Sequence, residues 1–161
     1  MSEPVGEVAA QGWSKDLADC HPSIVAAYPI VEAQFLKAHP DLWMRPDYTW
    51  RSPAFQHTLF EKGRAIQGGV WVLVNASEKV TDDDGVIRAS HHNVYPSQAA
   101  DFIIFREKSP LWSNPHDLED VNTKLYIEIA TMFEAQGLVA GATWKFNWKD
   151  YSHVQVAYTI V

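Results

Sequence analysis

The sequence SHHNVYPSQAADFIIF, residues 90–105, joins a polar loop to an apolar run. Its second half, Ala99–Phe105, is short and almost continuously apolar, which predicts a buried central strand. The first half holds His91 and His92 before a Tyr-Pro-Ser turn signal, and Asp101 follows within the apolar run. A histidine on a loop and an aspartate at the mouth of a buried strand can together bind one cation.

A third ligand is needed, because a catalytic zinc ion usually has three protein ligands and an open position. The sequence KDYSH, residues 149–153, offers Asp150 and His153 near the C-terminus. The nine-residue gap from His92 to Asp101 differs from the i, i+4 spacing of helical zinc motifs. Spacing alone therefore supports metal binding and an ordinary structural role equally. Solvated or capping roles are expected for four other histidines: His21, His39, His57 and His116.

Composition limits the class of protein. With 161 residues, 47% of them apolar and 20% charged, the chain is expected to form a single domain over residues 1–161, with residues 1–12 as a loose tail. The net charge of −7 and the lack of a basic run argue against nucleic-acid binding. Cys20 is the only cysteine, which excludes an internal disulfide and a cysteine zinc cluster. Without an evident signal peptide or membrane span, we expect synthesis in the cytoplasm and no membrane insertion.

The pattern of apolar residues predicts an α+β fold. Helical spacing over Ser23–Ala38 predicts a first helix, which Pro29 would kink or split. Ser52 and Pro53 are typical of an N-cap and a first helical position, and this second helix should end at Gly63. A third helix is predicted over His116–Gln136.

Further strands are predicted by short apolar or aromatic runs. They cover Met44–Arg51, the two arms of a hairpin-like region that begins at Gly68–Gly69 (Val70–Val74 and Val86–Arg88), Ala142–Trp148 and His153–Ile160. Helices and strands are segregated along the chain, which favours a mostly antiparallel sheet flanked by helices. The acidic turn Asp82–Asp84 can bind a cation, but a solvated hairpin tip is the expected role.

Three motifs, in this order, resemble those of a known family. Ser90–His92 matches a Ser-x-His motif, Ser97–Asp101 matches Gly/Ser-x-Ala-x-Asp, and Asp150–His153 matches Asp-x-x-His. With the Gly-Ala-Thr-Trp stretch at 141–144, they resemble the zinc D-alanyl-D-alanine carboxypeptidases and L-alanyl-D-glutamate endopeptidases. The resemblance runs from the first helix to Val156 and implies the Hedgehog/DD-peptidase fold.

The resemblance also implies a metal site and its chemistry. One zinc ion would be held by His92, Asp101 and His153, with His91 a neighbour rather than a ligand. Asp150 would act as general base. Arg51 stands in a Tyr-Thr-Trp-Arg-Ser stretch similar to a family segment, and would hold a substrate carbonyl or carboxylate.

Four further residues are expected to contact substrate by the same resemblance. Gln56 and Trp144 lie in segments similar to family motifs, and Trp144 is expected in the core or in the wall of the groove. Ser90 and Ser97 are candidates for hydrogen bonds to substrate, with capping of the loop as the alternative. Two features depart from the family pattern: the gap from His92 to Asp101 is two residues longer, and the segment 66–89 exceeds a minimal linker.

The function expected from this resemblance is cleavage of the peptidoglycan stem peptide by a monomeric zinc metallopeptidase. An L-alanyl-D-glutamate endopeptidase of the phage or prophage endolysin type is the leading expectation, stored in the cytoplasm and acting on the cell wall after release. A D-alanyl-D-alanine carboxypeptidase or dipeptidase would share the same zinc and base. A non-catalytic zinc module of a virion or cell-wall-binding protein is the alternative from another class.

Overall fold

Strand β4 lies at the centre of the fold. The computed structural model describes residues 4, 6–145 and 149–157, and in it β4 spans Ala99–Arg106 with all but its last residue buried. β4 pairs antiparallel with β1 and β5 along its second half and with β7 along its first, and β6 extends the sheet beyond β7. These partner strands are β1 (Leu42–Pro46), β5 (Ser109–Leu111), β6 (Val139–Ala140) and β7 (His153–Gln155). The predicted central strand and α+β class with antiparallel sheets are confirmed.

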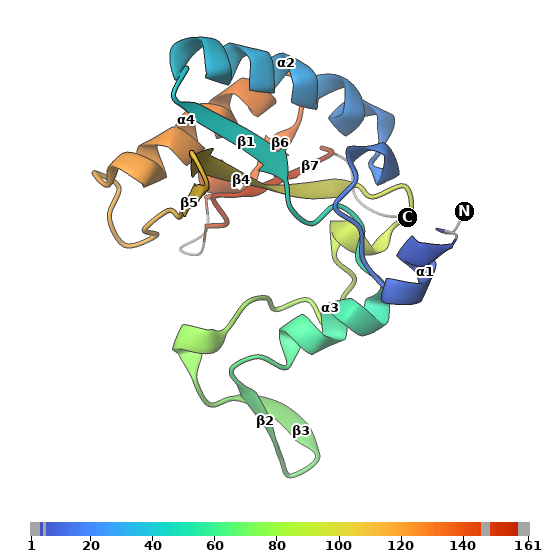
Figure 1. Ribbon diagram of the computed structural model, residues 1–161. Coiled ribbons are helices and arrows are strands. Elements are labelled where there is room, and N and C mark those ends of the chain that lie inside the picture. The colour runs from blue at the N-terminus through green and yellow to red at the C-terminus, as the bar shows by residue number, and fades with distance from the viewer. Residues whose placement is uncertain (1–3, 5, 146–148, 158–161) are drawn as a thin grey trace.

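Two long helices cover one side of this sheet (Figure 1). α2 spans Pro22–Ala38 and continues through Pro29, so the first predicted helix is present and is not split. α4 spans Val121–Ala135. α4 meets the sheet through aromatic contacts: the ring of Phe102 lies 5.5 Å from that of Tyr126 and 5.6 Å from that of Phe133. Tyr28 of α2 packs in turn on Phe133. The core therefore lies between β4 and this helical layer.

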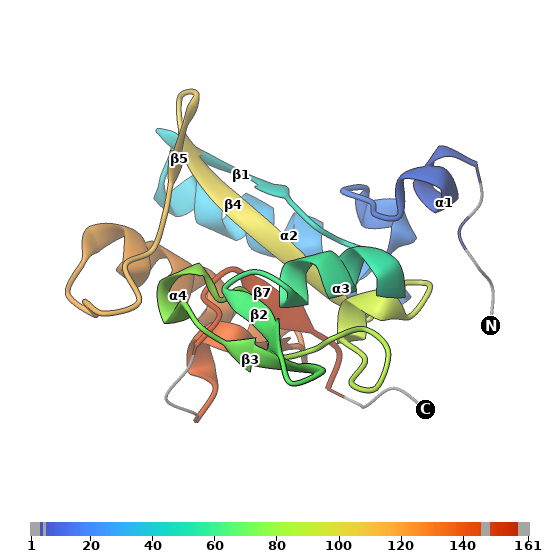
Figure 2. The ribbon, with the colours of Figure 1, turned by 90° about the horizontal axis from the view of Figure 1, so that it is seen from below.

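On the opposite side of the sheet lie α3 and a small hairpin (Figures 1 and 2). α3 spans Pro53–Phe60, and the hydroxyl of Ser52 accepts a hydrogen bond from the backbone N–H of Phe55, as the N-cap prediction requires. The hairpin consists of β2 (Arg64–Gln67) and β3 (Val70–Leu73). Gly68–Gly69 has positive φ at both residues and forms the hairpin turn itself, whereas the sequence predicted that it begins the first arm.

The acidic turn is not a hairpin tip, and Val86–Arg88 is not a strand. The carboxylate of Asp84 accepts hydrogen bonds from the backbone N–H groups of residues 86, 87 and 88, which closes a local turn. Asp82 pairs with Arg64 and Lys79. The turn is thus held by its own hydrogen bonds and by neighbouring cations, features that hydrophobic alternation does not reveal.

Three further boundaries differ from the predictions. Residues 7–11 form a short helix, α1 (Glu7–Gln11), within the predicted loose tail, and the next residues pair with the segment before α3, as in the hydrogen bond from Ser52 N–H to the Gly12 carbonyl. β1 ends at Pro46 instead of Arg51. Beyond it, Asp47 and Tyr48 still bond to the backbone of Asp101 in β4, but the N–H groups of Thr49 and Arg51 donate to carbonyls outside the sheet, at Ser14 and His92. α4 begins at Val121 instead of His116, because the carboxylate of Asp120 caps it.

The C-terminal strands are shorter than predicted. Where a strand was expected from Ala142 to Trp148, Gly141–Thr143 is a 3₁₀ helix and residues 144 and 145 are not in a strand; residues 146–148 lie outside the described part of the chain. β7 begins at His153 as predicted, while residues 158–160 also lie outside the described part. The other 3₁₀ helices are Leu17–Asp19, Ala76–Glu78 and His91–Asn93. In the described part of the chain, no helix has the length and apolar character needed to cross a membrane.

Truncation of the central strand should destabilise the protein strongly. Phe102 is 1% exposed and contacts both α4 aromatics, so Phe102→Ala should lower the free energy of unfolding by about 3–5 kcal/mol through lost burial and a residual cavity. Chemical denaturation of the apo protein measures this. A loss below about 1 kcal/mol would contradict the position assigned to β4 in the core.

Candidate metal centre

The pairing of β4 with β7 brings two distant side chains face to face. Asp101 and His153 are direct partners in the antiparallel register, although 52 residues separate them in the sequence. Opposed residues of an antiparallel pair project to the same face of the sheet with their Cβ atoms about 4.5–5.5 Å apart. The strand register therefore places a carboxylate against an imidazole with no help from the loops.

His92 reaches the same point from a capped loop. It lies in the 3₁₀ helix His91–Asn93, where the Ser90 hydroxyl accepts from the backbone N–H of His92 and the Asn93 side chain accepts from the N–H of Ser90. The carbonyl of His92 also accepts from the N–H of Arg51. These bonds fix the loop against the segment before α3.

The longer connection between His92 and Asp101 is anchored at its far end. The phenol of Tyr95 donates to the carboxylate of Asp19, and the N–H of Ser97 donates to the Asp19 carbonyl. The Ser97 carbonyl in turn accepts from the N–H of His21. The loop that follows His92 is thus tied to the segment that precedes α2.

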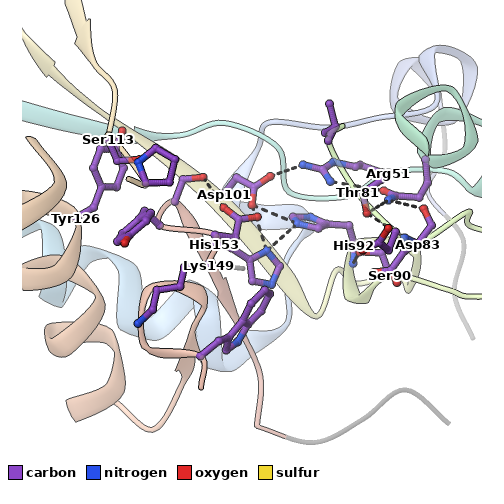
Figure 3. Close-up of a pocket in the computed structure, with 18 of the residues that line it drawn as sticks. Arg51, Thr81, Asp83, Ser90, His92, Asp101, Ser113, Tyr126, Lys149 and His153 are labelled. Carbon is purple, nitrogen blue, oxygen red and sulfur yellow. Dashed lines mark hydrogen bonds and ion pairs between the residues drawn. The ribbon is translucent and has the colours of Figure 1, made fainter. Parts of the chain in front are cut away.

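The three side chains form a compact group of ligand atoms (Figure 3). His92 Nε2 lies 3.3 Å from His153 Nδ1 and 3.4 Å from Asp101 Oδ1, and His153 Nδ1 lies 3.2 Å from Asp101 Oδ1. In a tetrahedral zinc site with bonds of about 2.0–2.1 Å, neighbouring ligand atoms are about 3.3–3.4 Å apart. The spacing and the donor types therefore fit a zinc ion. This is the only such group found among the described residues.

Hydrogen bonds on the outer side of each ring leave the inner nitrogens free to bind metal. His92 Nδ1 lies 2.6 Å from the carbonyl oxygen of Thr49, which can only accept, so Nδ1 carries the proton and Nε2 presents its lone pair. His153 Nε2 lies 2.9 Å from the amide oxygen of Gln155, which leaves Nδ1 as the ligand atom. Such outer partners are typical of metal-binding histidines.

The electrostatics of the group favour a bound cation. Burial, followed by the Arg51 charge, lowers the pKa of His92 to about 4, so the ring is neutral near pH 7. Burial opposes ionisation of Asp101, but the neighbouring His92 and Arg51 hold its pKa well below the usual range. Burial lowers the pKa of His153, but the hydrogen bond and charge of Asp101 outweigh it and raise the pKa overall. An anionic carboxylate thus faces two imidazoles.

Asp150 lies beside this group rather than within it. Burial, followed by the charge of Asp101, raises the pKa of its carboxyl group, and the hydroxyl of Ser152 donates to Oδ1 at 3.1 Å. The Asp150 backbone packs so closely on Gly141 that a Cβ at position 141 would overlap its carbonyl oxygen. A glycine is therefore required there, which explains the Gly before the Trp-bearing segment.

Arg51 makes a contact that the sequence did not predict. Its Nη2 pairs with Asp101 Oδ2, so the guanidinium fixes the second oxygen of the carboxylate while Oδ1 faces the imidazoles. Gln56 is buried, accepts from Arg51 Nη1 at 3.5 Å, and donates to Thr81 Oγ1 and the Asp83 carbonyl. Arg51 thereby holds Asp101 in place, and Gln56 holds Arg51. Both residues also line the cleft.

Of the remaining candidates for substrate binding, one is buried in the loop and two border the cleft. Ser97 is fully buried: its hydroxyl lies within donating distance of the carbonyls of Thr49 and Ala99 and accepts from the N–H of Ala99, which are contacts of the capping alternative. Ser90 caps the 3₁₀ helix but also borders the cleft. Trp144 borders it as well, with its ring 5.4 Å from that of His153, in agreement with a groove wall.

The metal-binding group opens into a cleft of about 490 Å³. Segments far apart in the sequence meet there: the loop 80–83 and Arg88, the loop 112–115, and residues 149–153 that include Asp150. Figure 3 shows Thr81 and Asp83 on the Arg51 side of His153, and Ser113 and Tyr126 on the other side. Sequence reasoning missed the contribution of both loops, because neither has a motif.

Comparison with known proteins adds no family assignment. No model of a known protein family matches this chain, and no curated protein matches it significantly. The geometry of the metal-binding group and its cleft is therefore the basis for the functional proposal.

The two adjacent histidines should differ in metal binding. His92→Ala removes a ligand and should abolish stoichiometric zinc binding, whereas His91→Ala should still bind one zinc ion because its side chain is not among the converging atoms. Zinc content after dialysis, measured by atomic emission, tests both. Loss of zinc from His91→Ala with retention in His92→Ala would move the ligand by one residue.

Proposed function

We propose that this protein is a zinc metallopeptidase that hydrolyses the stem peptides of peptidoglycan, with a fold of the Hedgehog/DD-peptidase type. The observation that supports this most strongly is the group of His92 Nε2, Asp101 Oδ1 and His153 Nδ1 at zinc-like spacing, with Asp150 in the same cleft. Three protein ligands leave a tetrahedral ion one open position, as in catalytic zinc sites. The substrate class is inferred from the order of the three sequence motifs, which resembles that of peptidoglycan peptidases.

Asp150 is suited to move the proton during hydrolysis. A zinc ion at this centre would supply Lewis acidity, which polarises a substrate carbonyl and promotes ionisation of water. The raised pKa of the Asp150 carboxyl brings it closer to neutral pH, where a general base exchanges protons most effectively. Its carboxylate takes a proton from the attacking water and delivers it to the leaving amine.

Arg51 has two roles in this proposal. Its ion pair with Asp101 Oδ2 orients the carboxylate. Its positive charge also lies in the wall of the cleft in which the substrate carbonyl would bind. Preorganised positive charge stabilises the negative charge that develops on the carbonyl oxygen during attack, and single groups of this kind contribute about 2.7–4 kcal/mol in other acyl-transfer sites. Arg51 is therefore a positioning residue that also contributes to the field in the cleft.

An L-alanyl-D-glutamate endopeptidase of the endolysin type is the preferred specificity. An endopeptidase must bind residues on both sides of the bond it cuts, and cleft residues lie on both sides of His153 (Figure 3). A D-alanyl-D-alanine carboxypeptidase or dipeptidase would use the same centre. A non-catalytic zinc module is disfavoured, because structural zinc sites are closed by four protein ligands.

Digestion of purified peptidoglycan with and without a chelator tests the proposal. Mass analysis of the soluble products should show new L-Ala C-termini that depend on zinc. Release of free D-Ala would instead support the carboxypeptidase, and no release with zinc bound would support the binding module and contradict the proposal.

Asp150→Asn should separate catalysis from metal binding. The amide keeps the size of the side chain and an oxygen for the Ser152 hydroxyl but cannot accept the proton, so hydrolysis should fall by about 10²–10⁴-fold. Zinc content and thermal stability should stay near those of the parent, since Asp150 lies outside the converging group. Asp101→Asn serves as the matched control and should weaken zinc binding itself. Full activity in Asp150→Asn, or loss of its zinc, would contradict the assignment of the base.

A further inference from the structure

Gln155 contacts the outer side of a metal ligand and has no role in the proposed reaction. It lies in β7 two residues after His153, and alternation along a strand puts both side chains on one face. Its amide oxygen lies 2.9 Å from Nε2 of His153. The contact is with the nitrogen that points away from the centre.

Metal binding dictates which end of the amide must face the ring. If His153 binds through Nδ1, the neutral imidazole carries its proton on Nε2 and needs an acceptor there. The amide oxygen of Gln155 is such an acceptor, whereas a reversed amide would place NH₂ against N–H and lose the bond. The orientation of the amide thus decides whether Nδ1 or Nε2 of His153 carries the lone pair.

His91 provides the group that fixes this orientation. Its Nε2 lies 3.4 Å from the amide nitrogen of Gln155, so a neutral His91 can accept from the NH₂ group while the oxygen remains on His153. The position of His91 is itself held, because its carbonyl accepts from the N–H of Gln98. A chain of two hydrogen bonds therefore leads from His91 through Gln155 to the ligand ring.

We propose that Gln155 is a positioning residue that selects the metal-binding tautomer of His153, and that His91 acts through Gln155 by fixing the direction of its amide. This inference rests on the zinc site of the proposed function, but not on the reaction or its substrate. It gives the adjacent histidines separate tasks: His92 binds the ion, and His91 orders the partner of the other imidazole.

Zinc affinity of the full chain, measured by competition with a chromophoric chelator, tests the role of Gln155. Gln155→Leu removes the acceptor and should raise the zinc Kd by about 10–100-fold, as loss of such outer partners does elsewhere. Gln155→Glu keeps an oxygen toward Nε2 and should restore affinity close to that of the parent. The unfolding midpoint of each apo protein shows that the fold is retained.

A double-mutant cycle tests the role of His91. His91→Ala should weaken zinc binding less than Gln155→Leu, because the amide can still adopt the correct direction part of the time. In the Gln155→Leu background, His91→Ala should have no further effect, since the amide through which it acts has been removed.

The outcomes that overturn the inference are distinct from failure of the peptidase proposal. Parent-like zinc affinity in Gln155→Leu, or equal losses in the Leu and Glu variants, would overturn the role of Gln155. Additive effects in the double variant would overturn the role of His91, and absence of zinc binding by the parent would overturn both. A parent chain that binds zinc but releases no product from peptidoglycan would contradict the proposed function alone.

Discussion

The antiparallel pairing of Asp101 with His153 is the constraint on which the rest of the site depends. Strand register is set over the whole buried length of β4, so a shift of one residue would turn Phe102 or Ala100 toward the centre and Asp101 into the core. The apolar side of β4, packed on α2 and α4, thereby specifies the position of a charged group on its other side. Hydrophobic burial and ligand geometry are determined together.

Around this pair, buried polar groups are satisfied by backbone carbonyls that accept hydrogen bonds and by a guanidinium group that donates them. The Thr49 carbonyl accepts from His92 and from the Ser97 hydroxyl, which joins His92 to the loop that follows it. Arg51 neutralises the side of Asp101 that faces away from the imidazoles. A buried carboxylate is costly without such partners, and a metal ion shared with the two imidazoles would be a further partner.

Part of this arrangement could be predicted from the sequence. The apolar run after Ser97 identified β4, the Ser52–Pro53 pair located the start of α3, and the order of three motifs selected His92 over His91. Other features depend on contacts between distant segments, which no local pattern contains. The pairing of Arg51 with Asp101 and the carbonyl behind His92 belong to this group.

The remaining differences between the predicted and the observed elements have local physical causes. The Gly68–Gly69 pair is compatible with either the start of a strand or a turn, and only the pairing of β2 with β3 decides between them. The sequence does not distinguish Asp120 from Asp117 as the N-cap of α4, because aspartate is an equally good cap at either position. For Gln155 a signal did exist: its spacing of two from His153 on a strand places both on one face.

Diffraction from crystals of the zinc-loaded protein, recorded on either side of the zinc absorption edge, tests directly whether His92, Asp101 and His153 bind a zinc ion. We expect one anomalous peak within bonding distance of His92 Nε2, Asp101 Oδ1 and His153 Nδ1, open toward the cleft that contains Asp150. A zinc peak ligated by His91, a peak at the Asp82–Asp84 turn alone, or no peak at this centre would contradict it.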